Sequence, residues 1–301
     1  MSSDLGNRWL IDSHQHVFWH GRDDRGLVLD MDEHGIDQAW LLTWEESYEE
    51  MGGNYAPLLD PRFTAKGTGT AIPFELIIEA YRRYPDRFVP GYCPHPADVH
   101  AVGKLQAAAR IHGVKVCGEW KFSMPFDDPR CIEIFRAAGD LGLPVVLHLD
   151  VPYLPPAGGA YVGHGRWKGG TIDNLERALI QCPHTTFIGH APGFWREMAG
   201  NADQIKDVYL SPPLAPGGRL PRLFDMYPNL CADLSAGSAL RAMQADPGEA
   251  RKLLLRHPDR FLFGRDYYGG ELLAFLSKLD LPKDVWRKIG RENAQRLIGI
   301  T

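Results

Sequence analysis

The stretch Gly142-Leu-Pro-Val-Val-Leu-His148 carries a pattern that recurs along the chain: a helix end, a Pro or Gly, and a short run of β-forming residues. Proline removes a backbone N–H and restricts the residue before it, so it ends a helix before a strand begins. The pattern returns in five more segments, and two apolar runs near the N-terminus complete a set of eight predicted strands: Trp9–His16, Gln38–Thr43, Tyr84–Val89, His112–Val116, Gly142–His148, Cys182–His190, Tyr227–Cys231 and His257–Gly264.

Longer stretches with helical patterning lie between these runs: Phe74–Arg83, Val99–Ile111, Pro129–Leu141, Asn174–Gln181, Ala239–Arg256 and Gly270–Leu297. Short apolar runs that alternate with helices predict an α/β protein with parallel strands. Eight such units most simply close into a (β/α)8 barrel of the TIM type. The alternative is an open doubly wound sheet, which usually has a Gly-rich phosphate turn after its first strand. This chain has His14-Gln-His-Val-Phe-Trp19 there, which favours the barrel.

Long segments follow the second, fifth and sixth predicted strands: Trp44–Thr70, Asp150–Thr171 and Ala191–Leu220. In barrel enzymes the loops that leave the carboxyl ends of the strands build the active site. No linker or shift in composition divides the chain, so we expect residues 1–301 to form a single domain with long βα loops.

The composition limits the classes of partner. The chain has 33 Lys and Arg against 38 Asp and Glu, a formal net charge of −5, which argues against a phosphate-binding surface. No apolar run reaches the roughly 20 residues that span a bilayer, and the first residues lack the apolar core of a signal peptide. We therefore expect a small-molecule substrate and no nucleic-acid or membrane partner, and leave homo-oligomer formation open. Five scattered cysteines without a Cys-x-x-Cys motif favour a reduced, cytoplasmic protein.

The first predicted strand ends in two histidines. Because side chains alternate along a strand, His14 and His16 share a face, with Asp12 deeper on the same face. Two imidazoles at this spacing can bind one divalent ion. A His-x-His pair is also common by chance.

Three further predicted strands end in residues of the same kind: His148, His190 and Asp266. Each has an ordinary explanation, such as a core histidine or a helix-capping aspartate. These explanations do not account for ligand-type residues at matching ends of four strands. A closed barrel would gather all five groups at one mouth, and the sequence therefore predicts a metal site there.

The fourth predicted strand places polar residues on alternate positions. Alternation puts Lys115, Cys117, Glu119 and Lys121 on one face, and Val114, Val116 and Trp120 on the other. We expect the Lys and Glu face to point into the barrel. A Glu–Lys ion pair that fills the interior is one interpretation of that face, and a role at the metal site is the other.

These residues together resemble the amidohydrolase superfamily. The resemblance rests on His14-Gln-His16, His148, His190 and Gly264-Arg-Asp266. More narrowly, the chain is similar to the amidohydrolase-related branch that includes aminocarboxymuconate semialdehyde decarboxylase and many metal-dependent hydrolases. The segment Gly290–Leu297 resembles that branch's C-terminal helix.

The resemblance implies a ligand set of His14, His16, His148 and Asp266, usually for Zn, although Mn or another divalent ion also suits it. His190 would polarise the substrate, and Asp266 would also move a proton. Because this superfamily often places a bridging group at the end of strand four, Glu119 is a further candidate ligand. If Glu119 bridges, His148 and His190 could hold a second ion. We expect one ion rather than two.

Residues just past the strand ends are candidates to bind the substrate: Trp19, Trp120, Lys121, Arg265 and Tyr267. Such residues also pack loops onto barrels without touching a ligand. Asp12 and Asp233 could orient the metal ligands or serve as buried structural carboxylates.

A divalent ion in such a site lowers the pKa of bound water from about 15.7 toward 7, and Asp266 beside it could accept the proton. The leading hypothesis is therefore a metal-dependent hydrolase that acts on a C–O or C–N bond of a lactone, ester or amide. The alternative is a metal-dependent, non-oxidative decarboxylase of a small carboxylic acid. A barrel that binds a ligand without catalysis is the third hypothesis.

Overall fold

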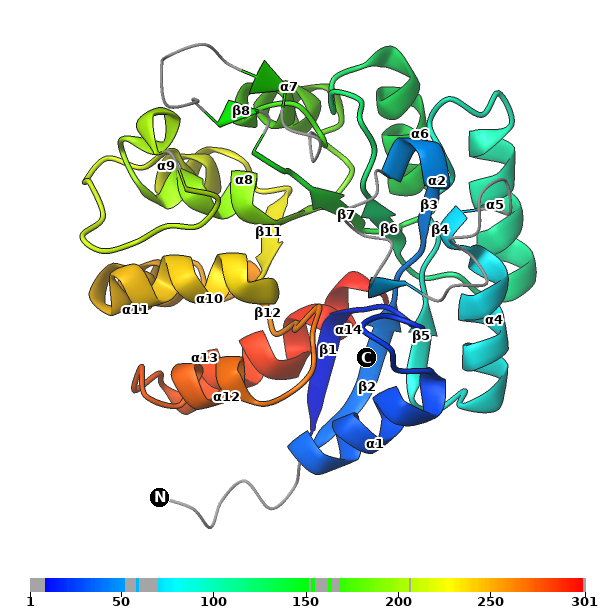
Figure 1. Ribbon diagram of the computed structural model, residues 1–301, viewed down its shortest axis with the longest axis horizontal. Helices are drawn as coiled ribbons and strands as arrows, with labels where there is room; N and C mark the ends of the chain where they lie inside the picture. The colour runs from blue at the N-terminus through cyan, green and yellow to red at the C-terminus, as the bar shows by residue number, and fades with distance from the viewer. Residues whose placement is uncertain are drawn as a thin grey trace.

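Eight parallel strands form the centre of the protein (Figure 1), in a computed structural model that describes residues 9–51, 58–59, 70–151, 153–154, 162–163, 168–205 and 207–299. Hydrogen bonds arrange the strands in two sheets, of order β1-β2-β5 and β12-β11-β10-β7-β6. The strand bounds are β1 (Leu10–Gln15), β2 (Ile36–Leu41), β5 (Phe88–Pro90), β6 (Cys117–Trp120), β7 (Val145–His148), β10 (Phe187–His190), β11 (Leu230–Asp233) and β12 (Phe261–Leu262).

Two junctions close these sheets into a ring. A parallel bridge joins Gly91, just after β5, to Val116, just before β6. On the other side, the Ser13 N–H of β1 donates to the Phe263 carbonyl at 2.9 Å. The predicted (β/α)8 barrel is confirmed. Seven of its strands overlap the predicted runs, whereas β6 begins one residue after the predicted run His112–Val116 ends.

The barrel interior below the mouth is apolar. Each strand or its immediate flank contributes a buried side chain to one cluster: Ile11, Trp40, Val89, Val116, Val146, Ile188, Cys231 and Leu262. Ala294 and Ile298, at the C-terminal end of the chain, pack against the same cluster. This layer fills the barrel with side chains, so polar chemistry is confined to the carboxyl ends of the strands.

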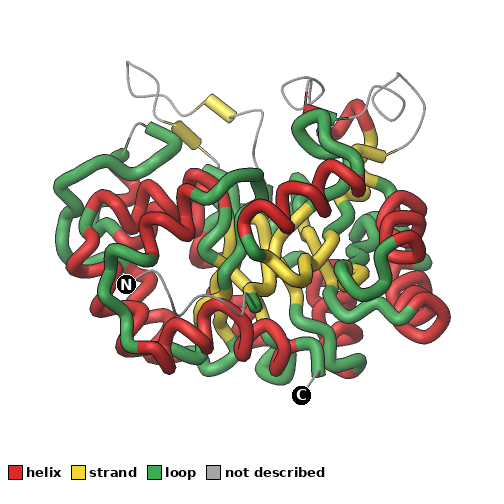
Figure 2. The backbone as a smooth tube through the Cα atoms, turned by 90° about the horizontal axis from the view of Figure 1, so that it is seen from below, coloured by secondary structure: helices red, strands yellow, loops and turns green. Residues whose placement is uncertain are grey.

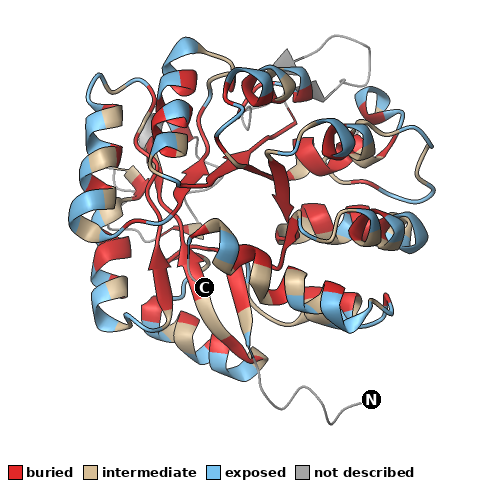
Figure 3. Cartoon of the chain, turned by 180° about the vertical axis from the view of Figure 1, so that it is seen from behind, coloured by how far each residue is buried: buried red, intermediate tan, exposed pale blue. Residues whose placement is uncertain are grey.

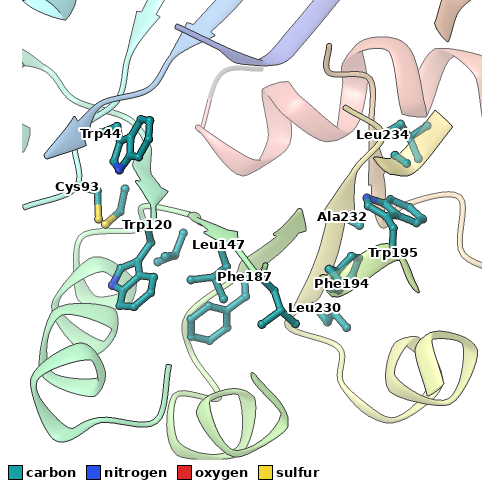
Figure 4. Packing of buried hydrophobic residues seen from close by; sticks show 14 of the residues in the cluster. Trp44, Cys93, Trp120, Leu147, Phe187, Phe194, Trp195, Leu230, Ala232 and Leu234 are labelled. Atoms are coloured by element: carbon teal, nitrogen blue, oxygen red, sulfur yellow. The ribbon is translucent and has the colours of Figure 1, made fainter. Parts of the chain in front are cut away.

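A second apolar layer lies between the strands and the helices. Leu147, Phe187 and Ala232 point outward from their strands and meet aromatic residues such as Phe194 (Figure 4). Figure 3 shows strands that are buried over most of their length and helices that are buried on one side only. This is the burial expected of a barrel inside a ring of amphipathic helices.

The helices surround the ring (Figure 1). Their bounds are α1 (Asp24–His34), α2 (Tyr48–Met51), α4 (Phe74–Arg83), α5 (Ala101–His112), α6 (Pro129–Asp140), α7 (Ile172–Gln181), α8 (Pro192–Trp195), α9 (Arg219–Met226), α10 (Ala236–Ala245), α11 (Pro247–Arg256), α12 (Glu271–Leu276), α13 (Lys283–Arg287) and α14 (Asn293–Leu297), with short turns η2 (Arg196–Met198), η3 (Ala202–Gln204) and η4 (Lys288–Glu292). Among these described helices, none is long and apolar enough to cross a membrane.

Two predicted helices are each broken in the structure. The stretch 239–256 divides where the Asp246 carboxylate accepts from the Glu249 N–H at 3.0 Å and Pro247 begins α11. The stretch 270–297 divides between α12 and α13, which Pro282 precedes. Both prolines occupy helix starts, where a missing N–H costs nothing. Helices α1 and α9 were not among the predicted stretches.

The long loops carry short strands of their own. β3 (Trp44–Ser47) pairs antiparallel with β4 (Thr70–Ile72), and β8 (Tyr153–Leu154) pairs with β9 (Val162–Gly163). Figure 2 shows these additions on one face of the barrel and the C-terminal end at the other. Parts of the predicted loops 44–70 and 150–171 lie outside the described residues.

Strand β6 departs from simple alternation. Val116 packs in the barrel interior and Cys117 in the outer layer, so the expected faces of these two residues were wrong. Between Cys117 and Trp120 the register against β7 shifts, because Cys117 pairs with Val145 and Trp120 with Leu147. The extra residue restores the expected faces for Glu119, which points inward, and Trp120, which points outward.

Glu45, in β3, provides a test of stability against pH. Its Oε1 accepts from the Phe74 N–H at 3.0 Å, and burial raises the pKa of Glu45 from 4.5 to about 7. The native state thus holds this proton more tightly than the unfolded chain, and the resulting stability is lost as pH rises through 7. We expect Glu45→Gln to match the wild type in urea unfolding at pH 5 and to exceed it at pH 8.

The exposed Glu79, also in α4, gives the matched control. Glu79→Gln should shift stability equally at both pH values. An equal change in stability at pH 5 and pH 8 in Glu45→Gln would contradict the raised pKa of the Glu45 carboxyl group.

Candidate metal centre

Six predicted ligand or catalytic side chains meet at the barrel mouth. His14 and His16 come from the end of β1, Glu119 from β6, and the remaining three from the ends of β7, β10 and β12: His148, His190 and Asp266. All are buried except Asp266, whose side chain is 13 % exposed. Parallel strands bring their carboxyl ends to the same rim, and this is why residues so distant in sequence converge.

The donor atoms surround a common point. His16 Nε2 lies 3.4 Å from Glu119 Oε2 and 3.5 Å from Asp266 Oδ1. His14 Nε2 lies 3.8 Å from Glu119 Oε1 and 3.8 Å from Asp266 Oδ1. His190 Nε2 lies 3.7 Å from both carboxylates. Neighbouring ligands of a tetrahedral ion at 2.0–2.2 Å are separated by about 3.4 Å, close to these spacings.

Three of these atoms have no hydrogen-bond partner among the described residues: His14 Nε2, Glu119 Oε2 and Asp266 Oδ1. A buried polar atom without a partner costs roughly 1–3 kcal/mol, so natural proteins rarely leave several together. A divalent cation would satisfy all three. Nitrogen and carboxylate donors are the set that Zn and related ions prefer. The residues present therefore fit a metal ion.

Asp233, at the end of β11, orients two of the histidines. Its carboxylate lies 2.8 Å from His14 Nδ1 and 3.0 Å from His190 Nδ1, and it accepts from the Ser235 hydroxyl at 2.5 Å. Burial would raise the pKa of Asp233, but His190 and His14 lower it well below its usual range. Because Asp233 binds the Nδ1 atoms of His14 and His190, the Nε2 atoms of both rings face the metal site. His16 is fixed in the same way by the Leu42 carbonyl, 2.8 Å from its Nδ1.

Asp233→Asn should weaken metal binding by about 10- to 100-fold, the usual cost of losing a carboxylate that orients a histidine ligand. Competition with a chromogenic chelator measures the affinity. Asp225→Asn, on the surface of α9, is the control and should leave the affinity at the wild-type value. An unchanged affinity in Asp233→Asn would show that the two rings are positioned without it.

His148 differs from the other three histidines. Its Nδ1 lies 2.5 Å from Glu119 Oε1. Burial would raise the pKa of Glu119, but Lys121 and His148 lower it well below its usual range. The donor atoms of His14, His16 and Asp266 form one group, and those of Glu119, His148 and His190 form another, each within 4.8 Å. Glu119 belongs to the second group and its Oε2 also lies 3.4 Å from His16 Nε2 of the first, so the arrangement suits either one ion or two.

Three of the predicted substrate-binding residues lie near this centre. Lys121 Nζ is 3.7 Å from Glu119 Oε2 and 4.3 Å from the centroid of the Trp44 ring. The Trp19 indole N–H donates to the Asp266 carbonyl at 3.0 Å. Tyr267 follows Asp266 directly and is 51 % exposed.

The other two predicted substrate-binding residues lie elsewhere. Trp120 is fully buried in the outer layer, with Phe122 and Phe126 at 5.1 and 5.0 Å between ring centroids (Figure 4). Arg265 Nε donates to Asp12 at 2.7 Å and its Nη1 to Asp30 at 2.7 Å, in a buried cluster that links β12 to β1 and α1. Asp12 therefore holds Arg265 rather than orienting a histidine ring.

Sequence reasoning missed a buried ion pair beside the site. Lys168 Nζ lies 2.5 Å from Glu46 Oε1 and 3.2 Å from Ser123 Oγ, with Lys168 and Glu46 almost fully buried. These residues come from three different βα loops. Only the folded loops bring them together, so no local pattern could have indicated the contact.

Comparisons with known proteins identify the family of the chain and proteins that share its fold. A family model described as Amidohydrolase matches residues 11–300. Among solved structures, 5-carboxyvanillate decarboxylase from Sphingomonas paucimobilis is 17 % identical, with a TM-score of 0.64 over 98 % of this chain and 100 % of that chain. No curated protein matches the sequence.

Two further solved structures share the fold. A 5-carboxyvanillate decarboxylase from Novosphingobium aromaticivorans, complexed with manganese, is 15 % identical, with a TM-score of 0.62 over 100 % of this chain and 98 % of that chain. A probable 2-pyrone-4,6-dicarboxylic acid hydrolase from Acinetobacter baumannii is 13 % identical, with a TM-score of 0.56 over 97 % and 99 %. At these identities the likeness shows the fold alone.

Proposed function

Because the chain belongs to the amidohydrolase family, we propose that it is a metal-dependent, non-oxidative decarboxylase of a small carboxylic acid. The same donor set also supports a hydrolase, the leading hypothesis from the sequence, which we keep as the second candidate. The two decarboxylases described above support the first choice. We propose Zn or Mn as the ion. Five buried, unpaired cysteines are compatible with the cytoplasmic location that we also propose.

The proposal rests on the position of the Lys121 side chain. Its side chain is 4 % exposed, and its ammonium group lies beside the metal donors, 3.7 Å from Glu119. A charge in a site with little water acts more strongly than one in solvent. A carboxylate substrate would be held between this ammonium and the ion. A neutral lactone or amide has no need of such a cation.

Asp266 is the residue placed to move the proton. Its side chain is the most exposed of the donor set, and Oδ1 has no hydrogen-bond partner in the part of the chain described. When bound, the divalent ion would supply positive charge that orients the acid. In this step Asp266 acts in its protonated form. The C–CO2 bond breaks, its electron pair stays with the substrate carbon, and that carbon takes the proton from Asp266 as CO2 leaves. The Asp266 carboxylate then takes a proton from solvent, so the net change is R–CO2⁻ + H⁺ → R–H + CO2.

Hydrolysis is favoured by a different residue. Glu119 is a buried carboxylate between two donor groups, and a centre with two ions is well suited to the attack of water on a lactone, ester or amide. In that reaction Asp266 would accept the proton of the attacking water and deliver it to the leaving group.

The two functions are separated by product analysis. Protein loaded with Mn or with Zn is incubated with a panel of aromatic acids, and CO2 release is measured; the same preparations receive lactones and amides. We expect metal-dependent CO2 release, and an increase in KM in Lys121→Gln. Lys115→Gln, an exposed lysine near the other end of the same strand, should behave as wild type. Turnover of lactones or amides without CO2 would favour hydrolysis instead.

A further inference from the structure

Asp150 is a buried carboxylate that the proposed reaction does not use. It follows β7 by two residues and is 3 % exposed. Its Oδ1 accepts from the Val151 N–H at 3.0 Å. Its Oδ2 is buried and has no hydrogen-bond partner in the described part of the chain. A buried acceptor without a hydrogen-bond donor costs free energy, and a charged acceptor costs more. A donor for Asp150 Oδ2 is therefore expected.

The strand pattern places Asp150 at the mouth. Val146 packs in the barrel interior and His148 belongs to the donor set, whereas Leu147 and Leu149 pack in the outer layer. Alternation therefore puts Asp150 on the inner face, one step above His148. Its Oδ2 lies 3.9 Å from His148 Nε2, which is too far for a hydrogen bond.

A second charged residue lies at the mouth on the neighbouring strand. Lys121 stands one inner-face step above Glu119, as Asp150 stands above His148. The pairing of Trp120 with Leu147 sets Lys121 level with His148, one inner-face step below Asp150. Among the described residues, these two strand ends thus carry the Lys121 ammonium, which lies 3.7 Å from Glu119 Oε2, and the Asp150 Oδ2 atom, which has no hydrogen-bond donor.

We propose that Asp150 is a specificity-determining residue, whose Oδ2 accepts a hydrogen bond from a hydroxyl or N–H group on the substrate. The inference rests on the proposed function, since the substrate's carboxylate is the group that reaches Lys121 and the ion. An acid without such a donor would leave Oδ2 unsatisfied and bind more weakly. A methoxy group in place of that hydroxyl has no hydrogen to donate, so its oxygen and Asp150 Oδ2 would be two acceptors facing each other.

Binding to the Mn-loaded protein tests this without turnover. The probes are benzoate and the 2-, 3- and 4-hydroxybenzoates, each paired with the methoxybenzoate of the same position, in calorimetric titrations. We expect at least one hydroxy isomer to bind about tenfold or more tighter than its methoxy partner, as a hydrogen bond to a charged group implies. Asp150→Asn places an amide at this position, and we expect that ratio to fall to within about threefold of one.

Controls separate this role from folding and from the proposed reaction. Asp173→Asn, on the exposed surface of α7, should keep the wild-type ratio. Asp150→Ala, checked for wild-type metal content and unfolding midpoint, should lose the preference as Asp150→Asn does. A wild type without hydroxy preference, or a preference that survives both substitutions, overturns the role of Asp150. Failure of every acid to bind overturns the proposed function as well, whereas a preference without CO2 release overturns the proposed reaction alone.

Discussion

Asp266→Asn is expected to lower turnover by about 10²- to 10⁴-fold, the range for loss of a positioned proton donor. Asn keeps the size of the side chain and the backbone N–H that donates to the His14 carbonyl at 2.8 Å. It cannot supply the proton, and it is a poorer metal ligand than a carboxylate. The measurement is kcat under saturating Mn, with the metal content of the variant determined in parallel.

The chain offers a matched control for backbone effects. Asp266 has φ of +53°, a conformation that favours Gly, Asn and Asp, and the exposed Asp280 has φ of +48°. Asp280→Asn should therefore leave both turnover and stability at wild-type values. Turnover within threefold of wild type in fully metal-loaded Asp266→Asn would show that this carboxylate neither moves the proton nor holds the ion.

Lys168→Met is expected to cost about 3–5 kcal/mol of unfolding free energy, the cost of leaving one member of a buried ion pair alone. Glu46 is 1 % exposed and would lose the ammonium 2.5 Å from its Oε1. Burial lowers the pKa of Lys168, and Glu46 opposes that effect. Urea unfolding of the metal-free protein measures the change without a contribution from the ion.

Two further variants test the cause of the stability loss in Lys168→Met. Glu46→Leu combined with Lys168→Met should recover most of the stability, because a buried pair replaced by apolar groups is often neutral. Lys252→Met breaks an exposed pair with Glu249 at 2.6 Å and should cost less than about 1 kcal/mol. A loss in Lys168→Met no larger than in Lys252→Met would contradict the structural role of the buried pair.

The barrel and its donor set were predictable because both depend on local signals. Pro and Gly mark the strand starts, as in Gly142–His148, and the fixed handedness of parallel units then brings strand ends such as His148 and His190 to one rim. Glu119 was placed correctly although alternation failed for Val116 and Cys117, since the register shift compensated.

The remaining features depend on contacts that no local pattern encodes. Lys168 meets Glu46 across 122 residues, and only the folded loops bring them together. Arg265 follows a strand end as a substrate-binding residue would, but Asp12 and Asp30 supply nearer partners. Asp233 could have been either a structural or an orienting carboxylate, and only its distances to His14 and His190 decide between them.

The most direct test of the account is the metal content of protein purified without chelator, measured by elemental analysis for the wild type and His14→Ala. We predict one divalent ion per chain in the wild type and a steep loss in His14→Ala. His190→Ala should keep that ion, whereas a two-ion centre would fall from two toward one. Equal and full metal content in the wild type and His14→Ala would contradict the assignment of the centre.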